Sequence, residues 1–398
     1  MNRQTELRLI KEILALKQEG KTQYHESTQT LSTERYISEQ WYQKEQDALF
    51  KNRPMAIGLA NEIPEIGDYQ AIDWVNGISL LVVRDKNNQV RVFANACRHR
   101  NSRLVDNNSS GCKRRFSCPY HAWTYNTEGE LIGAPEFESG FSDLDKKNLG
   151  LIEFNSRVIS GIIYLHFDLN QQVPDNILAE EMISGFDYLN LEKQLVYKRR
   201  SYTIKANWKI LLEGGIEAYH FNVAHKSTLA PFFLGNLSTW ETWGRLDLRM
   251  ILPKKPMLDA LDLPESQWQI RKMANIIYSI SPSMLFLVQP DNISLIKMIP
   301  LSKGETRIDE VLLVDASVNG GNNWTPEEEK THETNHNLVN KILMEDWVLG
   351  ESIQANMEGG AVNQVHFGRF ESALIWFHQQ YDNAFSESQP LRPPARKL

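Results

Sequence analysis

The segment from residue 97 to residue 123 reads CRHRNSRLVDNNSSGCKRRFSCPYHAW, and it decides the fold of the region around it. Cys97 and His99 form one close pair, and Cys118 and His121 form a second, with residues 100 to 117 between them. Thiolates and imidazoles bind metals, and each pair is close enough to hold one side of a metal centre from a single turn. Serine, glycine and proline beside the pairs favour turns. The pattern therefore predicts a metal centre held by two loops.

Two kinds of centre satisfy these residues. A structural zinc ion takes two Cys and two His, or three thiolates if Cys112 joins them. A Rieske [2Fe–2S] centre takes two thiolates on one iron and two imidazoles on the other. Spacing alone does not exclude zinc, but the order Cys-His then Cys-His inside a short β-rich segment favours the Rieske centre. Cys112 is then spare, and we expect a small, partly buried thiol.

A second group of candidate ligands lies in residues 207–225, NWKILLEGGIEAYHFNVAH. If this segment is helical, Glu213, Glu217 and His220 share one face, opposite an apolar stripe. His225 follows His220 by five positions, so the two imidazoles converge only if the helix ends or bulges there. Two imidazoles and one carboxylate form the facial triad that binds Fe(II) and leaves positions open for O2. For a single His, an ordinary hydrogen-bonded residue is the alternative.

The carboxylate of such a triad is expected far along the chain. Residues 325–329, TPEEE, combine an N-cap, a first-turn proline and acidic residues, which predicts a helix from there to about Met357. On this helix we expect Asp346 inside an inward apolar stripe and Glu345 toward its edge. A buried carboxylate is costly unless it is paired or bound to metal, so Asp346 is the candidate third ligand; a buried Asp that caps a neighbouring element is the alternative. The expected stripe comprises Leu338, Ile342, Leu349 and Ile353.

These motifs resemble those of the Rieske non-haem iron oxygenases, of the large (alpha) subunit type of ring-hydroxylating oxygenase. The resemblance covers residues 97–100, CRHR, residues 118–123, CPYHAW, and the Glu-x-Tyr-His-x4-His pattern of residues 217–225. Asp346-x4-Glu351-x2-Gln354 is a looser match to the third-ligand segment. The resemblance implies two ligand sets: Cys97, His99, Cys118 and His121 for the [2Fe-2S] cluster, and His220, His225 and Asp346 for a mononuclear iron.

The resemblance also implies a role for Glu217. In the family, an acidic residue at this position bridges a cluster histidine of one subunit, here His121, and an iron histidine of its neighbour, here His220. Cluster and iron within one subunit are too far apart for fast electron transfer, so a ring-shaped homotrimer is implied. A carboxylate that bonds two metal-bound imidazoles also fixes their tautomers. A purely structural Glu–His pair is the alternative.

The fold implied is α+β: a small all-β Rieske [2Fe-2S] domain and a helix-grip (START/Bet v 1-like) catalytic domain, in which an antiparallel sheet wraps around a long helix. We expect an N-terminal helical extension at residues 1–54 that partly packs on the catalytic domain, the Rieske domain at 55–167 and the catalytic domain at 168–390. The residue pattern agrees with this fold. The β-rich runs are 78–83, 90–94 and 158–167, and strands at 293–301 and 308–314 are joined through a turn at Gly304.

Length and composition limit the classes of protein. A chain of 398 residues with 41% hydrophobic residues and 10 Trp is globular and long enough for two domains. Its formal net charge of -7 supplies no attraction to nucleic acid, and no stretch approaches the roughly 20 apolar residues of a membrane helix. The N-terminal residues mix both charges without an apolar core, so no secretory signal is expected. Three cysteines, an odd number, favour the reducing cytoplasm over a disulfide framework.

The resemblance implies the terminal oxygenase component of a multicomponent system, an oxidoreductase that uses O2. Electrons from NADH or NADPH would arrive through a separate reductase, with or without a ferredoxin, since no G-x-G-x-x-G follows a predicted strand. A β-type subunit is left open. Basic residues around the cluster motif are candidates for docking the redox partner, although solvated loop charge explains them equally well. They are Arg98, Arg100, Arg103, Lys113, Arg114 and Arg115.

The substrate implied is a small organic molecule, which is mono- or dioxygenated. The Glu217 motif looks more like relatives that act on quaternary ammonium compounds than like arene dioxygenases. Ring hydroxylation, hydroxylation of an aliphatic acid and oxidative N-demethylation all stay open. Two other classes compete: a Rieske electron-transfer protein without its own oxygenase chemistry, and a zinc-stabilised binding protein. Aromatic residues fall in the region expected to form the pocket wall, although core packing explains such residues more often. They are Phe232, Phe233, Trp240, Trp243, Tyr278 and Phe286.

Overall fold

The computed structural model describes residues 1–74 and 77–386. The chain divides into two compact units, one of Phe50–Leu178 and one that joins Met1–Leu49 to the part of the chain from Ala179 onward. The predicted Rieske domain, 55–167, lies inside the first unit, and most of the predicted extension, 1–54, belongs to the second. Residues 387–390 of the predicted catalytic domain lie outside the described residues. Within the described ranges, no helix is both long and apolar enough to cross a membrane.

The unit Phe50–Leu178 contains three small antiparallel sheets, and two of them share a core in which Tyr69, Phe93, Phe116 and Trp123 are buried. The predicted strand at 158–167 is wrong in one respect, because Ser160 and Gly161 both have positive φ and turn the chain into a hairpin. The sheets, in spatial order, are β5 (Val90–Ala94), β4 (Ser79–Arg84), β3 (Asp68–Asp73) and β6 (Ser110–Cys112); β7 (Arg115–Ser117), β8 (Thr124–Asn126) and β9 (Leu131–Gly133); and β10 (Asn155–Ile159), β11 (Ile162–His166) and β2 (Met55–Leu59). The described part of this unit also contains the short helices η1 (Ala60–Glu62), α4 (Phe137–Gly140) and η3 (Lys146–Leu149).

A seven-stranded antiparallel sheet forms the centre of the other unit. The predicted hairpin at its middle is confirmed, since β17 and β18 pair along their length and the chain turns at Lys303 and Gly304 between them. The spatial order is β12 (Leu195–Ile204), β18 (Glu305–Val314), β17 (Asn292–Ser302), β16 (Met284–Val288), β15 (Ala274–Ile280), β14 (Leu248–Pro253) and β13 (Thr239–Thr242).

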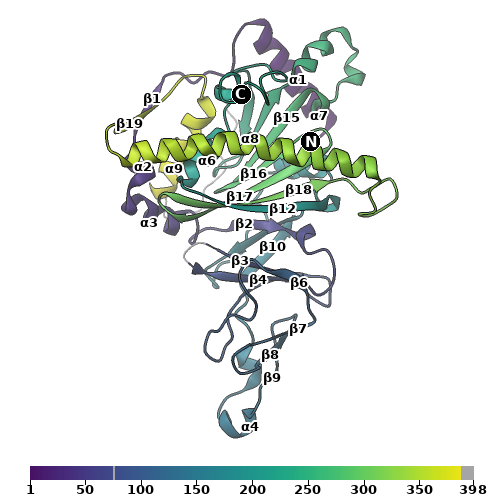
Figure 1. Cartoon of the computed structure of the whole chain (residues 1–398), viewed down its shortest axis with the longest axis vertical. Helices are drawn as coiled ribbons and strands as arrows, with labels where there is room; N and C mark the ends of the chain where they lie inside the picture. The colour runs from purple at the N-terminus through teal and green to yellow at the C-terminus, as the bar shows by residue number, and fades with distance from the viewer. Residues whose placement is uncertain (75–76, 387–398) are drawn as a thin grey trace. The chain divides into compact units, whose positions relative to one another are not determined.

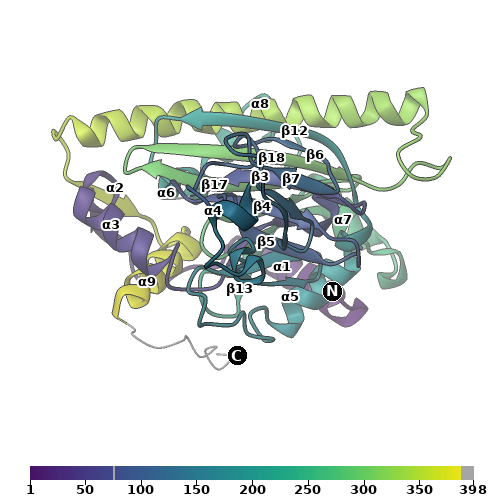
Figure 2. The same cartoon turned by 90° about the horizontal axis from the view of Figure 1, so that it is seen from below.

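The long helix α8 (Pro326–Glu358) lies across this sheet (Figure 1, Figure 2). It begins as predicted: Thr325 accepts a hydrogen bond from the N–H of Glu328, and the Glu328 carboxylate accepts one from the N–H of Thr325. This capping box satisfies two backbone donors that the helix leaves unpaired. An all-β unit and an antiparallel sheet crossed by a long helix confirm the α+β architecture expected from the sequence.

The predicted inward face of α8 is wrong for three of its four apolar residues, since only Ile342 is half-buried. Leu338, Leu349 and Ile353 are exposed, and the sheet side carries a different stripe at helical spacing. The helix has apolar residues on two faces, so a wheel alone cannot say which of them the sheet covers. Asp346 lies at the edge of the buried stripe, with its side chain 26% exposed. The buried residues are His332, His336, Val339, Leu343, Trp347, Gly350, Gln354 and Met357.

Shorter helices surround the sheet: α2 packs on α8 and α3 packs on α9, whereas α1 packs on β13 and η6 (Figure 2). Glu45 on α3 makes an ion pair with Lys209 on α6 and accepts hydrogen bonds from Trp208 and Tyr381, and both members of the pair are fully buried. This network joins α3 to α6 and α9. The helices are α1 (Arg3–Gln18), α2 (Glu34–Ile37), α3 (Glu39–Ala48), α5 (Glu180–Tyr188), α6 (Trp208–Gly214), α7 (Ile270–Met273) and α9 (Ser372–Ser386), with short turns η4 (Leu191–Lys193), η5 (His220–Asn222), η6 (Lys255–Asp262) and η7 (Glu265–Gln267). Strands β1 (Gln29–Ser32) and β19 (Gln364–Phe367) form a separate pair.

Candidate metal centres

Two loops of the same construction carry the four candidate cluster ligands. In one, the N–H of Asn101 donates to the carbonyl oxygen of Cys97; in the other, the N–H of Ala122 donates to that of Cys118. Asn101 and Ala122 both have φ of 58°, the left-handed conformation that closes each turn. The backbone N–H of each cysteine is bonded as well, to Ser102 and to Trp123 respectively. The two cysteines are therefore held rigidly at equivalent positions.

The structure brings like ligands together. The side chains of Cys97 and Cys118 are within hydrogen-bond reach and both are buried, whereas the imidazoles of His99 and His121 face one another with ring centroids 4.6 Å apart. His121 is exposed and His99 half-buried. Two thiolates at an inner position and two imidazoles at an outer one fit a Rieske cluster, in which each iron takes one pair.

The surroundings of the cysteines bear on their charge. Burial raises the pKa of Cys97. Burial also opposes ionisation of Cys118, yet hydrogen bonds from the N–H groups of Tyr120 and His121 hold its pKa below the usual value. The phenol oxygen of Tyr125 lies 3.3 Å from Cys97 Sγ, within reach to donate to a thiolate. Cys112, expected to be partly buried, is exposed instead, because β6 presents it to solvent.

The second candidate site lies where α6 ends. The helix stops at Gly214, and the chain then runs through a non-helical stretch to the single turn η5 (His220–Asn222). A continuous helix through residues 207–225 is therefore wrong, and the helix end that convergence of His220 and His225 requires is present. Gly214 and Gly215 favour such an end because glycine is a poor helix former.

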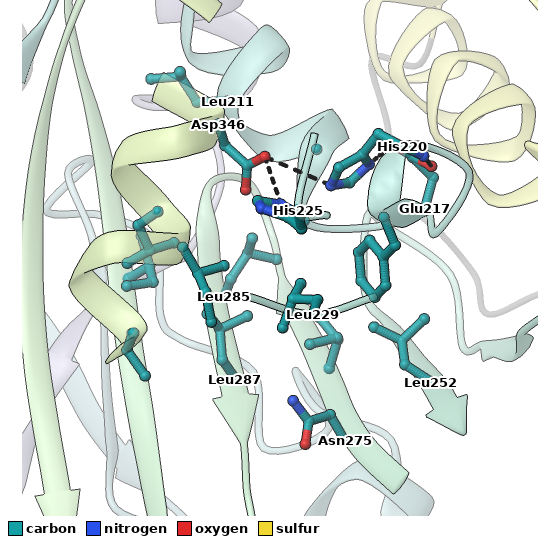
Figure 3. Close-up of a pocket in the computed structure, with 18 of the residues that line it drawn as sticks. Leu211, Glu217, His220, His225, Leu229, Leu252, Asn275, Leu285, Leu287 and Asp346 are labelled. Atoms are coloured by element: carbon teal, nitrogen blue, oxygen red, sulfur yellow. Dashed lines mark hydrogen bonds and ion pairs between the residues drawn. The ribbon is translucent and has the colours of Figure 1, made fainter. Parts of the chain in front are cut away.

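His220, His225 and Asp346 converge at one point (Figure 3). Asp346 Oδ1 lies 2.9 Å from His225 Nε2 and 3.5 Å from His220 Nε2. Neither Nε2 has a hydrogen-bond partner among the residues that the structure describes. Two nitrogens and one carboxylate oxygen within 4.8 Å of one another match the donor set of the facial triad. The residues present therefore fit a mononuclear iron.

A carboxylate holds the other nitrogen of each imidazole. Glu217 bonds His220 Nδ1, and Glu345 bonds His225 Nδ1 at 2.7 Å and accepts a hydrogen bond from Thr228. Burial opposes a charge on His225, but Asp346 and Glu345 raise its pKa overall. Carboxylates at Nδ1 leave both Nε2 atoms directed at the same point, the arrangement usual around metal-bound histidine. No role for Glu345 was predicted from the sequence, although a carboxylate directly before a candidate metal ligand could have indicated one.

A pocket of about 780 Å³, part of it open to solvent, extends from these residues between α8 and the sheet (Figure 3). Its wall is mostly aliphatic, because alternate residues of neighbouring strands face α8. Of the six aromatic residues expected there, only Phe233 is among the described lining residues; Tyr278 and Phe286 are fully buried against Phe186 instead. The strand residues of the wall are Leu252, Asn275, Ile277, Leu285, Leu287, Ile296 and Met298.

Comparison with known families defines the class of protein. Residues 54–149 match the Rieske [2Fe-2S] domain, and residues 191–387 match the ring hydroxylating alpha subunit (catalytic domain). The chain belongs to the Rieske non-haem iron oxygenases, whose two domains carry a [2Fe-2S] cluster and a non-haem iron and which receive NAD(P)H electrons through a reductase.

The relatives include a dioxygenase subunit named for an aromatic compound and a monooxygenase subunit named for a quaternary ammonium compound. The chain is 29% identical to the biphenyl 2,3-dioxygenase subunit alpha of Rhodococcus jostii over 47% of this chain and 41% of that one. It is 30% identical to the glycine betaine monooxygenase oxygenase subunit of Pseudomonas aeruginosa over 52% of this chain and 46% of that one. The matched region thus spans about half the length of these curated relatives.

Solved structures share the fold. The quaternary ammonium Rieske monooxygenase CntA in complex with L-carnitine has a TM-score of 0.72 at 20% identity and covers 90% of this chain and 96% of its own. Naphthalene 1,2-dioxygenase from Rhodococcus sp. bound to indole has a TM-score of 0.73 at 16% identity, with 96% and 99% covered.

Proposed function

We propose that this protein is the terminal oxygenase component of a multicomponent system, which uses O2 and electrons from NAD(P)H to mono- or dioxygenate a small organic substrate. The observation that carries the proposal is the convergence of His220 Nε2, His225 Nε2 and Asp346 at one end of a pocket. An electron-transfer protein without its own chemistry has no use for such a trio beside an apolar cavity.

The candidate residues fall into a cluster set and an iron set. We assign Cys97, His99, Cys118 and His121 to the cluster, and His220, His225 and Asp346 to the mononuclear iron. When bound, the cluster supplies electrons singly and the iron supplies the site at which O2 is reduced beside the substrate. Glu217 and Glu345 hold the histidine Nδ1–H groups and so fix their tautomers. The aliphatic wall binds the substrate and excludes water from the reacting end.

Metal analysis tests this assignment. Purified wild type should contain about three irons and two acid-labile sulfides per chain. His220→Ala should fall to about two irons with the cluster absorption unchanged, and the control His366→Ala, at an exposed histidine, should keep all three. Two irons in wild type and both variants would reduce the protein to an electron carrier, and zinc without sulfide would overturn the whole assignment.

We also propose that Glu217 links two subunits of a homotrimer, between His121 of one copy and His220 of the next. An exposed apolar patch beside His220 supports a second copy as the occupant of this surface, since apolar side chains that face solvent mark interaction sites. The patch comprises Val223, Met344, Val348 and Leu349.

Mixed assemblies separate this proposal from electron transfer within one chain. Each of His121→Ala and His220→Ala lacks one end of the path, so neither alone should consume O2 in the presence of reductant. Assembled together, they should recover part of the wild-type rate, because the intact cluster of one copy serves the intact iron of its neighbour. A mixture as inactive as its components would contradict transfer between subunits.

A redox partner with an acidic surface fits the cluster side of the Phe50–Leu178 unit. Arg100, Arg103, Lys113 and Arg114 are exposed there, as is Arg115. Arg98 is half-buried and donates to the carbonyl oxygen of Gly150, so it is less available for docking. We propose a reductase, with or without a ferredoxin, as this partner; opposite charges would speed the encounter and make its rate fall with ionic strength.

A further inference from the structure

Apart from the metal end, the described lining of the pocket has two polar residues, Asn275 and Gln289. Asn275 lies at the end of the cavity away from His220, His225 and Asp346 (Figure 3). Its Oδ1 is buried and has no hydrogen-bond partner within residues 1–74 and 77–386. A buried amide oxygen without a partner is unfavourable, so a ligand that supplies a donor there gains affinity.

Strand register places a second amide beside the first. Ile276 on β15 pairs with Val288 on β16. The antiparallel register therefore places Asn275 opposite Gln289, one residue beyond this pair. Directly opposed residues have Cβ atoms about 5 Å apart on the same face of the sheet. Both residues line the pocket, and together they present donors and acceptors to one group of a bound molecule.

Charge distribution in the pocket disfavours ionic substrates. Among its described lining residues there is no Lys or Arg, and its two carboxylates, Glu217 and Asp346, already face histidines. Arg271, near the amide end, donates to the backbone carbonyl oxygen of Gln289 and does not line the cavity. A zwitterion such as a carboxylated quaternary ammonium compound would bury its carboxylate without a cation, which costs far more than burying a neutral group.

We propose that the substrate is an uncharged, mostly apolar molecule with one hydrogen-bonding group, and that Asn275 and Gln289 determine specificity by binding that group. The inference rests on the proposed function, because it takes the same pocket as the site of reaction. A molecule anchored at the amide end presents its opposite, apolar end to His220, His225 and Asp346. The position of oxidation is then set by the length between the anchored group and that end.

Binding of a matched pair of probes tests the proposal without turnover. 2-Naphthol and 2-methylnaphthalene differ by a hydroxyl in place of a methyl group, and L-carnitine represents charged substrates. Calorimetric titration of the metal-loaded protein without O2 at pH 7 should show that wild type binds 2-naphthol about tenfold more tightly than 2-methylnaphthalene, the value of one hydrogen bond. L-carnitine should not bind. Asn275→Leu should abolish the preference and leave 2-methylnaphthalene binding within about threefold, and Gln289→Met should reduce the preference.

The control Asn337→Leu makes the same exchange at an exposed position on α8 and should keep the wild-type preference. Tighter binding of L-carnitine than of 2-naphthol, equal binding of the two naphthalenes by wild type, or equal weakening of both by Asn275→Leu would each overturn the inference. Iron and sulfide measured on the same samples separate the two failures. If the mononuclear iron is present and the binding results disagree, the specificity inference is wrong and the proposed function is unaffected. If wild type lacks this iron, both are wrong.

Discussion

Replacing Lys209 by Met removes the cation from an ion pair with no solvent exposure on either side. Met matches the length of Lys, so little cavity forms and the main effect is electrostatic. The Glu45 carboxylate keeps its hydrogen bonds from Trp208 and Tyr381 but loses its counter-charge. Removing one partner of a buried pair costs about 3–5 kcal/mol, because a charge is left uncompensated. Burial lowers the pKa of Lys209, which shows how poorly this position solvates an ion.

Urea unfolding monitored by tryptophan fluorescence measures this cost. Lys198→Met is the matched control, since Lys198 pairs with Glu333 on the surface with both side chains 43% exposed, and such pairs contribute about 1 kcal/mol or less. In the double variant Glu45→Gln with Lys209→Met, the amide oxygen can accept from Trp208 while the amide NH2 donates to the hydroxyl oxygen of Tyr381, and no charge is stranded, so the double variant should lose less stability than Lys209→Met alone. A Lys209→Met variant no less stable than Lys198→Met, or more stable than the double variant, would refute the reasoning.

Two further predictions concern the catalytic unit. Burial raises the pKa of Glu310 to about 7, and the carboxylate lies 4.0 Å from buried His336. At Glu310 the folded state therefore binds a proton that the unfolded state has released, so the contribution of this carboxyl to stability is lost as pH rises from about 4.5 to 7. Burial lowers the pKa of His336 to about 4, which gives the opposite slope over part of that range, so the test is the difference between wild type and variant. Glu310→Gln should lack a contribution worth on the order of 3 kcal/mol, and equal slopes of wild type and variant in denaturation series would contradict it. A Cβ at Gly215 would lie 2.4 Å from Leu285 Cδ1, whereas one at Gly214 meets nothing within 4 Å. Gly215→Ala should lose about 1–3 kcal/mol and lower the melting temperature, and Gly214→Ala should change stability by less than about 1 kcal/mol; similar melting temperatures would argue against this packing.

Local signals account for what the sequence could predict of the fold. The start of α8 follows from Thr325, Pro326 and Glu328, because a capping box acts within a single turn. The β17–β18 hairpin follows from two β-rich runs on either side of Gly304, and the two cluster loops from the close spacing of their ligands. In each case, the determining residues are neighbours along the chain.

Tertiary packing accounts for the rest. Which face of α8 is buried depends on the sheet beneath it, and apolar residues occupy both sides. A helical wheel drawn through residues 207–225 assumes a continuous helix, but α6 ends at Gly214. A role for Asn275 could not be predicted from the sequence, because a single Asn in a strand matches no motif. Its position opposite Gln289 in the pocket wall follows only from the strand register.

The pairing of His220 and His225 with Glu217 and Glu345 has a consequence for metal selection. Carboxylates at both Nδ1 atoms orient the two imidazoles from within the chain, so the same donors face any ion of similar size. Discrimination then falls to ligand chemistry, and for nitrogen and oxygen donors the later divalent metals bind more tightly than Fe²⁺ along the Irving–Williams order. These donors alone therefore give no preference for Fe²⁺ over Zn²⁺, and we expect the metal content of the purified protein to follow the metals supplied during its synthesis.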